Sequence, residues 1–208
     1  MPLSPYHQQY SEHSEEELFR RSSVKEHELN KIFNAVEFKS NIDPLRVAVL
    51  GCADARLVEY HRHMFEKVLG KRIDLTTFDI TIDHLAGQKG VVQHDCTLPF
   101  PNPPYDVMYS HVLLKFIETE KQWDVIIHSY EALRAPGLAI HIFNEEDVVT
   151  TDIKQNDGYW SVPLERWTKA LKDNDIQFRV IRWDIALETL PIPIRGLKGG
   201  ALILFKES

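Results

Sequence analysis

Residues 46–56 read RVAVLGCADAR, and this stretch decides the fold. The aliphatic run 47–50 has no polar break, which is typical of a strand buried on both faces of a parallel sheet. Gly51 then allows a tight turn, and the small residues after it let a ligand approach the main chain. Asp54 stands where a helix N-cap belongs, ahead of an amphipathic run over 57–69. The stretch predicts a strand, a turn and a helix, as at the start of a nucleotide-binding sheet or of any other α/β protein.

The composition is that of an ordinary globular protein, with 208 residues, 43% hydrophobic and 26% charged. This length suits one domain with a full core. No apolar run approaches the ~20 residues of a membrane span, and the first twenty residues are polar and acidic, unlike a secretory leader. Two cysteines fit a reducing compartment, so we expect a cytoplasmic protein with no membrane partner. The net charge of −7 argues against extended contact with nucleic acid, and the sequence gives no sign of the oligomeric state.

Strand and helix patterns alternate along the chain. Strands are predicted over 46–50, 72–78, 91–93, 105–109, 138–143, 177–183 and 201–205. Alternation favours parallel pairing through helical crossovers, whereas the last two strands have no helix between them and should pair antiparallel. The fold class expected is an α/β three-layer sandwich with a seven-stranded, mostly parallel sheet, the last strand antiparallel, and helices on both faces. Residues 41–208 form this domain, and residues 1–40 a helical extension packed on it, with a capping box at Ser14 and Glu17.

Asp79 closes the second predicted strand. In doubly wound sheets an acidic residue near this place accepts hydrogen bonds from ribose hydroxyls, although a cap for a short helix over 81–86 is the alternative. The turn at Gly51 lacks the three glycines of a dinucleotide site and the ending of a P-loop. The ligand left by these exclusions is a nucleoside without a phosphate chain.

Five blocks of sequence resemble, in their order, the class I (Rossmann-like) S-adenosylmethionine-dependent methyltransferases. They read VAVLGCADAR, LTTFDIT, VVQHDCTLPF, YDVMYSHVLL and LRAPGLAIHIF. The resemblance covers residues 46–143 and extends to the closing strand pair at 205. It implies S-adenosylmethionine as cofactor and in-line methyl transfer, and the acidic charge and an aromatic-bearing loop favour a small-molecule substrate.

The resemblance also implies a set of cofactor-binding residues that follow the predicted strands. These are Gly51, Cys52 and Ala53 in the turn against the methionine part, Asp79 on the ribose, Ile80 against the adenine, Asp95 and Cys96 on the adenine edge, and Ser110 in the cleft.

Three further residues are candidates for binding the acceptor or for its chemistry. His111 lines the same cleft by the resemblance and is the candidate general base, needed only if the acceptor carries a proton; a structural hydrogen bond is the alternative. Residues 144–162 form a long polar connection that interrupts the alternation. Within it, Tyr159 and Trp160 are the candidate substrate-binding residues.

Departures from the family pattern keep a second hypothesis open. Val49 stands where the family commonly has an acidic residue, and Ala53 and Ala55 replace two glycines. Alanine still lets a ligand approach the backbone, so binding is weakened as an expectation and not excluded. A catalytically degenerate methyltransferase-fold binding protein is therefore the alternative.

Two short motifs belong to other enzymes. Residues 52–56, CADAR, match the Cys-x-Asp-x-Arg of β-class carbonic anhydrases, and a zinc site on Cys52, His94 and Cys96 is conceivable. Residues 102–105 spell the NPPY of amino-group methyltransferases, but before the fourth strand and not after it. We interpret NPPY as a turn formed by its two prolines. For the carbonic anhydrase motif, we expect that no metal is bound.

Overall fold

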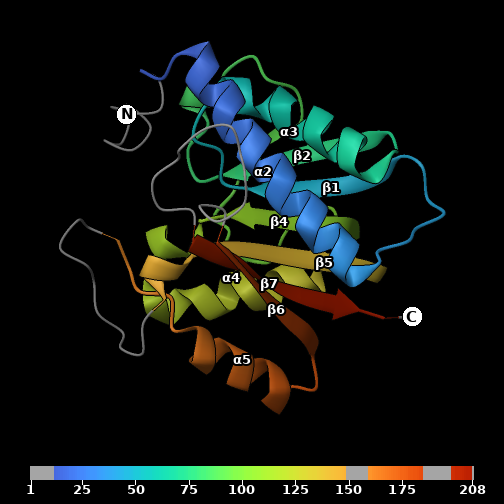
Figure 1. Cartoon of the computed structure of the whole chain (residues 1–208), viewed down its shortest axis with the longest axis vertical. Coiled ribbons are helices and arrows are strands. Elements are labelled where there is room, and N and C mark those ends of the chain that lie inside the picture. Colours follow the sequence, from blue (N-terminus) through green and yellow to red (C-terminus); the bar gives the residue numbers. More distant parts are fainter. Residues whose placement is uncertain (1–11, 149–158, 185–197, 208) are drawn as a thin grey trace. The chain divides into compact units, whose positions relative to one another are not determined.

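The computed structural model describes residues 12–148, 159–184 and 198–207. By internal contacts the chain divides into two compact units, Met1–Asp95 and Cys96–Ser208. Each is described by itself below, as unit 1 and unit 2, with the element labels of Figure 1.

Unit 1 contains two long helices and three parallel strands. The elements are α2 (Glu15–Val36), β1 (Leu45–Leu50), α3 (Ala55–Leu69), β2 (Ile73–Asp79), the 3-10 turn η1 (Asp83–Leu85) and β3 (Val91–Gln93). Their strand order is β3-β2-β1, with Leu50 opposite Phe78 and Asp79 opposite Gln93. Helix α3 packs on β2, and α2 lies beside α3 (Figure 1). The three strands predicted here are confirmed to within one residue at each end.

Both helix starts in unit 1 are the predicted caps. The Ser14 hydroxyl accepts a hydrogen bond from Glu17 N at 3.2 Å, and the Asp54 carboxylate accepts one from Arg56 N at 2.9 Å. These bonds satisfy amides that a helix leaves without an internal partner. Helix α3 is capped at its C-terminal end by Gly70, whose φ of 62° is the left-handed conformation usual at such a position.

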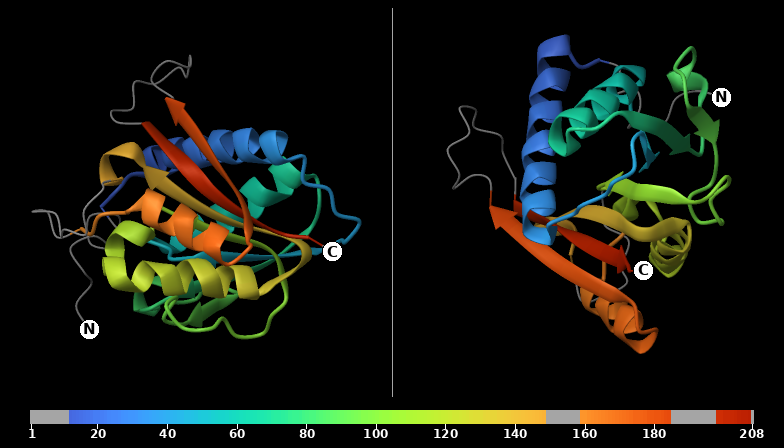
Figure 2. Two further views of the ribbon diagram at one scale, coloured as in Figure 1. Left: turned by 90° about the horizontal axis from the view of Figure 1, so that it is seen from below. Right: turned by 90° about the vertical axis from the view of Figure 1, so that its right-hand side faces the viewer.

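Unit 2 contains four strands and two helices. The elements are β4 (Tyr105–His111), η2 (Leu114–Phe116), α4 (Thr119–Glu131), β5 (Leu133–Asn144), η3 (Glu145–Asp147), α5 (Leu164–Asp173), β6 (Gln177–Asp184) and β7 (Lys198–Lys206). The order is β4-β5-β7-β6; β4 and β5 are parallel, whereas β7 is antiparallel to both β5 and β6. The predicted antiparallel pairing of the last two strands is thereby confirmed. Helix α4 packs on β5 and β7, and α5 packs on β6 (Figure 2).

All four strands of unit 2 extend beyond their predicted ends, β6 by one residue. Strand β4 continues through His111 because its last residues pair with β5 up to Ile142. Strand β5 begins at Leu133, ahead of the proline and glycine at 136–137, because Leu133 pairs with Tyr105 across an irregularity in the register. Strand β7 begins at Lys198, three residues before its predicted start, because Lys198 pairs with Asp184 of β6. Sequence patterns marked the apolar centres of these elements but not their polar ends.

In the part of the chain that the structure describes, no helix combines the length and the apolar character needed to cross a bilayer. The motif at 102–105 lies before β4, as interpreted from the sequence. Asn102 has a φ of 55°, and Tyr105 is buried in the strand with its hydroxyl donating to Pro101 O at 2.8 Å. These residues therefore act as a turn and a strand start.

Candidate functional site

The turn after β1 bends onto the end of β2 within unit 1. Gly51 has a φ of 77°, a conformation that residues with a side chain rarely adopt. Its amide donates to Phe78 O at 2.8 Å, and the next amide, Cys52 N, donates to Asp79 Oδ2 at 2.8 Å. The structure thus brings together three of the predicted cofactor-binding residues, Gly51, Cys52 and Asp79.

Asp79 is buried, and both of its carboxylate oxygens accept main-chain hydrogen bonds. Oδ2 accepts from Cys52 N, and Oδ1 accepts from Thr81 N at 3.1 Å. The second bond is a local turn, because η1 begins only at Asp83 and has no side-chain cap. A carboxylate offers about four lone-pair positions, so the two amides leave acceptor capacity. The group is therefore preorganised and still able to accept a hydrogen bond.

Ile80 follows this buried carboxylate and is 61% exposed. A ligand with an aromatic ring and a polar group suits such a pair of residues. Its ring would cover the exposed apolar side chain, and its polar group would bind the carboxylate. The Ile80 main chain is held, because its carbonyl accepts from Gln93 Nε2 at 3.1 Å. Asp95, the last predicted contact in unit 1, is half-buried, and its neighbour His94 donates its amide to Asp79 O at 2.8 Å.

The residues of the carbonic anhydrase motif form hydrogen bonds with one another in the turn after β1. The Cys52 thiol donates to Asp54 O at 3.3 Å, and burial raises its pKa to about 12, although Lys25 opposes this. Burial alone would raise the pKa of Asp54, but hydrogen bonds from the Arg56 side chain and backbone outweigh it and lower the pKa. A cysteine binds zinc as the thiolate, which the raised pKa disfavours. No group of three residues able to hold a metal occurs over 12–148, 159–184 and 198–207, so the zinc hypothesis gains no support.

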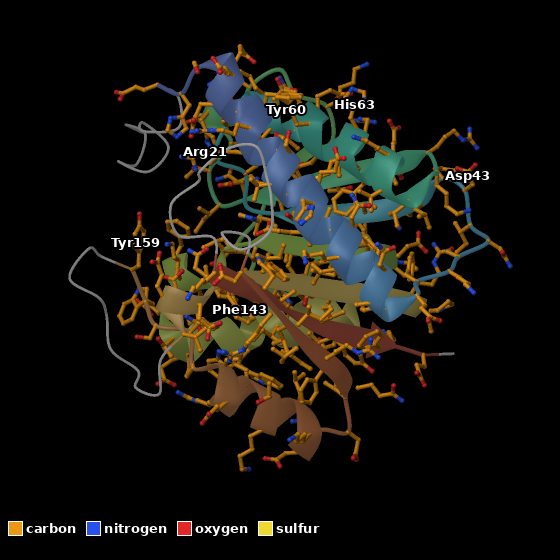
Figure 3. The ribbon with its side chains drawn as sticks, viewed as in Figure 1. Arg21, Asp43, Tyr60, His63, Phe143 and Tyr159 are labelled. Carbon is orange, nitrogen blue, oxygen red and sulfur yellow. The ribbon has the colours of Figure 1, made fainter. Side chains whose placement is uncertain are left out.

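Arg56 also links the starts of the two helices of unit 1. Its guanidinium pairs with Asp54 Oδ2 at 2.7 Å and with Glu15 Oε1 at 3.0 Å, and it donates to His13 O at 3.1 Å. Tyr60, labelled in Figure 3, adds a bond from its hydroxyl to Glu15 Oε2 at 3.3 Å. The start of α2 is thereby fixed beside the turn that carries Cys52.

Ser110, at the end of β4 in unit 2, has its side chain directed into the interior of that unit. Its side chain is completely buried, and its hydroxyl lies 2.9 Å from His141 Nδ1. The other ring nitrogen, His141 Nε2, lies 2.9 Å from Ser129 Oγ, whose hydroxyl bonds Ile126 O. Burial lowers the pKa of His141 to about 4, so the ring is neutral. The Ser110 hydroxyl therefore serves the interior of unit 2, and the role of the residue as a cofactor contact stays a prediction.

His111 is half-buried at the end of β4, with its ring centroid 6.4 Å from that of Tyr109. The next residue, Val112, has a φ of 57°, and its amide donates to Ile142 O at 2.9 Å. A β-branched residue in the left-handed region is strained, and such strain concentrates at functional sites. The strain therefore lies directly beside the candidate general base.

Tyr159 and Trp160 are attached to η2 in unit 2. Lys115 Nζ lies 4.4 Å from the Tyr159 ring centroid, the Phe116 ring packs against Tyr159 at 5.0 Å, and Trp160 N donates to Lys115 O at 2.7 Å. Figure 3 labels Tyr159. Most of the predicted substrate loop, residues 149–158, lies outside the described residues. The substrate role of the two aromatic residues stays a prediction.

Lys115 also forms a pair with the buried carboxylate of Asp147 at 3.4 Å, and Asn144 Nδ2 donates to the same oxygen at 2.9 Å. Burial raises the pKa of Asp147, and the Lys115 charge opposes this shift. The lysine is thereby held beside the Tyr159 ring.

Sequence reasoning did not predict the contacts of three residues: His84 and Val112 beside the candidate sites, and His141 in the interior of unit 2. His84 Nε2 lies 2.7 Å from Cys52 O, so the imidazole holds the turn from a short helix that carries no motif. The strain at Val112 has no sequence signal, because valine is the residue least expected with a positive φ. The polar character of His141 within an apolar strand was visible, but its two serine partners come from other elements.

No family model and no curated protein matches the chain. Solved structures do match its fold. A SAM-dependent methyltransferase from Archaeoglobus fulgidus is 11% identical, covers 93% of this chain and 100% of its own, and has a TM-score of 0.60. Magnesium protoporphyrin IX methyltransferase from Synechocystis, with bound SAM, is 14% identical over 91% of this chain and 82% of its own, with a TM-score of 0.57.

A third match is the N-methyltransferase NodS from Bradyrhizobium japonicum, 10% identical over 90% of this chain and 98% of its own, with a TM-score of 0.57. These identities are low, and the likeness is one of fold. It spans both units. The prediction of an α/β fold with a seven-stranded, mostly parallel sheet and one antiparallel strand is confirmed. The chain has the fold of the class I S-adenosylmethionine-dependent methyltransferases.

Proposed function

We propose that this protein is an S-adenosylmethionine-dependent methyltransferase with a small-molecule acceptor. One observation carries the proposal: the buried Asp79 carboxylate, bound to Cys52 N at 2.8 Å, stands next to the exposed side chain of Ile80. An acid with spare lone pairs and an apolar surface beside it suit a ribose and its base. The fold of the solved methyltransferases gives the same assignment as an analogy.

In this proposal the turn of unit 1 receives the amino-acid part of the cofactor. Gly51, Cys52 and Ala53 offer main chain with little side-chain bulk, and alanine in place of glycine still permits close approach. Asp79 accepts from the ribose hydroxyls, and Ile80 packs on the adenine. Asp95 and the Cys96 main chain read the adenine edge. Ser110 contributes only its main chain to the cleft, because its hydroxyl is used inside unit 2.

Methyl transfer from a sulfonium breaks one carbon–sulfur bond and forms one bond to the acceptor in line with it. The protein contributes chiefly by holding donor and acceptor in contact. Where the acceptor carries a proton, His111 accepts it; imidazole titrates near neutral pH and suits this role. Tyr159 and Trp160 contact the acceptor in this proposal. Cation–π contact with Lys115 and packing on Phe116 give Tyr159 a fixed orientation for doing so.

Calorimetric titration with S-adenosylmethionine and S-adenosylhomocysteine tests the cofactor. We expect binding to the wild type and at least a tenfold loss in Asp79→Asn, the scale of ~1.4 kcal/mol for a charge-assisted hydrogen bond. Asp74→Asn is the matched control, because Asp74 lies on the same strand with a side chain 62% exposed. Absence of binding to the wild type, or equal losses in the two variants, would contradict the proposal.

Product formation separates an enzyme from a degenerate binding protein. Both would bind S-adenosylmethionine, but only the enzyme converts it to S-adenosylhomocysteine in the presence of an acceptor. The assay measures this product by mass spectrometry with panels of small amines, phenols and carboxylic acids. Transfer that is lost in His111→Gln and rises with pH in the wild type supports a base; transfer that His111→Gln leaves unchanged shows that His111 has no such role.

A further inference from the structure

The turn after β1 is held by two side chains that bind successive peptide groups. Asp79 accepts from the amide of Cys52, and His84 Nε2 lies 2.7 Å from the carbonyl oxygen of the same residue. A carbonyl oxygen only accepts, so the imidazole donates through Nε2–H. His84 is the middle residue of η1, which is anchored by the buried Leu85 beside it.

Fixing this carbonyl fixes the following amide as well. The peptide between Cys52 and Ala53 is planar, and in a trans peptide the carbonyl and the N–H point in opposite directions. With Cys52 O directed at His84, the Ala53 N–H is directed away from it. Over the described ranges, which leave out 1–11, 149–158, 185–197 and 208, the Ala53 N–H has no hydrogen-bond acceptor. The residue itself is half-exposed, so this donor is available to a ligand.

The amino-acid composition of the turn explains why a side chain that fixes a peptide group can favour ligand binding. A turn rich in glycine reorients its peptides at little cost, and a ligand then selects the orientation it needs. Here only Gly51 retains that freedom, and Cys52 and Ala53 carry side chains. A side-chain donor that sets the peptide orientation in advance lowers the ordering cost of binding. The thiol bond from Cys52 to Asp54 O restrains the same residue further.

We propose that His84 is a positioning residue that presents the Ala53 N–H to the carboxylate of the cofactor's amino-acid part. The inference rests on the proposed function, because it concerns how the same turn receives S-adenosylmethionine. An N–H directed at a carboxylate makes a charge-assisted bond, so its orientation affects the affinity for ligands that carry the carboxylate. Ligands without the amino-acid part gain nothing from it.

The test compares His84→Leu, which removes the donor, with His84→Gln, whose amide nitrogen reaches as far as Nε2. Calorimetry measures affinity for S-adenosylhomocysteine and for adenosine, which lacks the amino-acid part. We expect His84→Leu to weaken S-adenosylhomocysteine about tenfold and adenosine less than twofold, and His84→Gln to recover affinity to within threefold of wild type. His63→Leu is the control, because His63 lies exposed on α3 in the same unit (Figure 3).

A second measurement is made on the ligand-free protein. The carbonyl ¹³C shift of Cys52 and the amide ¹⁵N shift of Ala53 should change in His84→Leu and stay near wild type in His84→Gln. Equal loss of adenosine and S-adenosylhomocysteine affinity, failure of His84→Gln to rescue, or unchanged shifts in His84→Leu would overturn the proposal. Should His84→Leu fail to fold, His84→Asn, which is too short to reach the carbonyl, replaces it. A wild type that binds neither ligand refutes the proposed function. The NMR shifts still report, independently of binding, whether His84 fixes the peptide between Cys52 and Ala53.

Discussion

Unit 1 and unit 2 each contain a cluster of hydrogen-bonded polar side chains beside a parallel strand, and the two clusters differ in their partners. The Asp79 cluster comprises Asp79 and His84 with the main-chain groups of Cys52 and Thr81. The His141 cluster comprises the side chains of Ser110, Ser129 and His141. The first binds the backbone of turns, and the second links two strands and a helix through side chains alone.

This difference separates a site from a structural network. Asp79 shapes a turn whose next neighbours, Ile80 and Ala53, are open to solvent to different degrees, and it keeps acceptor capacity. In the His141 cluster both ring nitrogens are engaged and all three side chains are buried. A buried polar residue therefore indicates function only when its partners leave a group of the site accessible.

The largest expected effect is that of Asp79→Ala on stability. Two amides, the buried Cys52 N and the part-buried Thr81 N, lose their acceptor, and the loss at a buried amide costs about 1–3 kcal/mol. We expect the free energy of unfolding in urea to fall by about 3 kcal/mol. Asp74→Ala, at an exposed carboxylate on the same strand, should change it by less than about 0.5 kcal/mol. A loss below about 1 kcal/mol in Asp79→Ala would mean that the carboxylate does not support the turn.

The second prediction concerns pH and the His141 cluster. The folded-state pKa of His141 is lowered to about 4 by burial, whereas the unfolded value is near 6.5. As the pH falls below 6.5 the unfolded chain binds a proton that the folded chain does not, so stability is lost progressively down to pH 4. The full difference is on the order of 3 kcal/mol, of which about 2 kcal/mol is expected between pH 7.5 and pH 5.

His141→Leu should remove that part of the pH dependence even though it is itself destabilising. Urea unfolding curves at pH 7.5 and pH 5 for wild type, His141→Leu and His63→Gln measure it. His63 is exposed, so its removal should leave the slope close to that of wild type. Equal slopes in wild type and His141→Leu would show that the buried imidazole takes up a proton in the folded state.

The same comparison explains how much the sequence predicts. Strand centres, both caps of unit 1 and the approach of Cys52 to Asp79 follow from hydrophobic runs and from residues that lie near strand ends, which are local signals. The partners of Ser110 cannot be predicted in this way, because Ser129 and His141 come from a helix and from another strand. The local sequence around a serine at a strand end is also the same whether the side chain faces a cleft or the core. The contact between His84 and Cys52 O likewise could not be predicted, because it forms only when the 3-10 turn η1 folds back onto the turn after β1.

The smallest expected effect tests the strain next to His111. Val112 has a φ of 57°, and an L residue in this region costs about 1–2 kcal/mol, which glycine avoids. Glycine loses about 0.5–1 kcal/mol more backbone entropy on folding, so Val112→Gly should gain about 0.5–1 kcal/mol in the free energy of unfolding. Val112→Ala keeps the strain of a Cβ atom and should show no gain.

A loss in Val112→Gly as large as in Val112→Ala would mean that side-chain packing at the end of β4 outweighs strain. A gain in stability with slower methyl transfer would tie the strain to the positioning of His111, because the strained conformation would then be kept for function at the expense of stability.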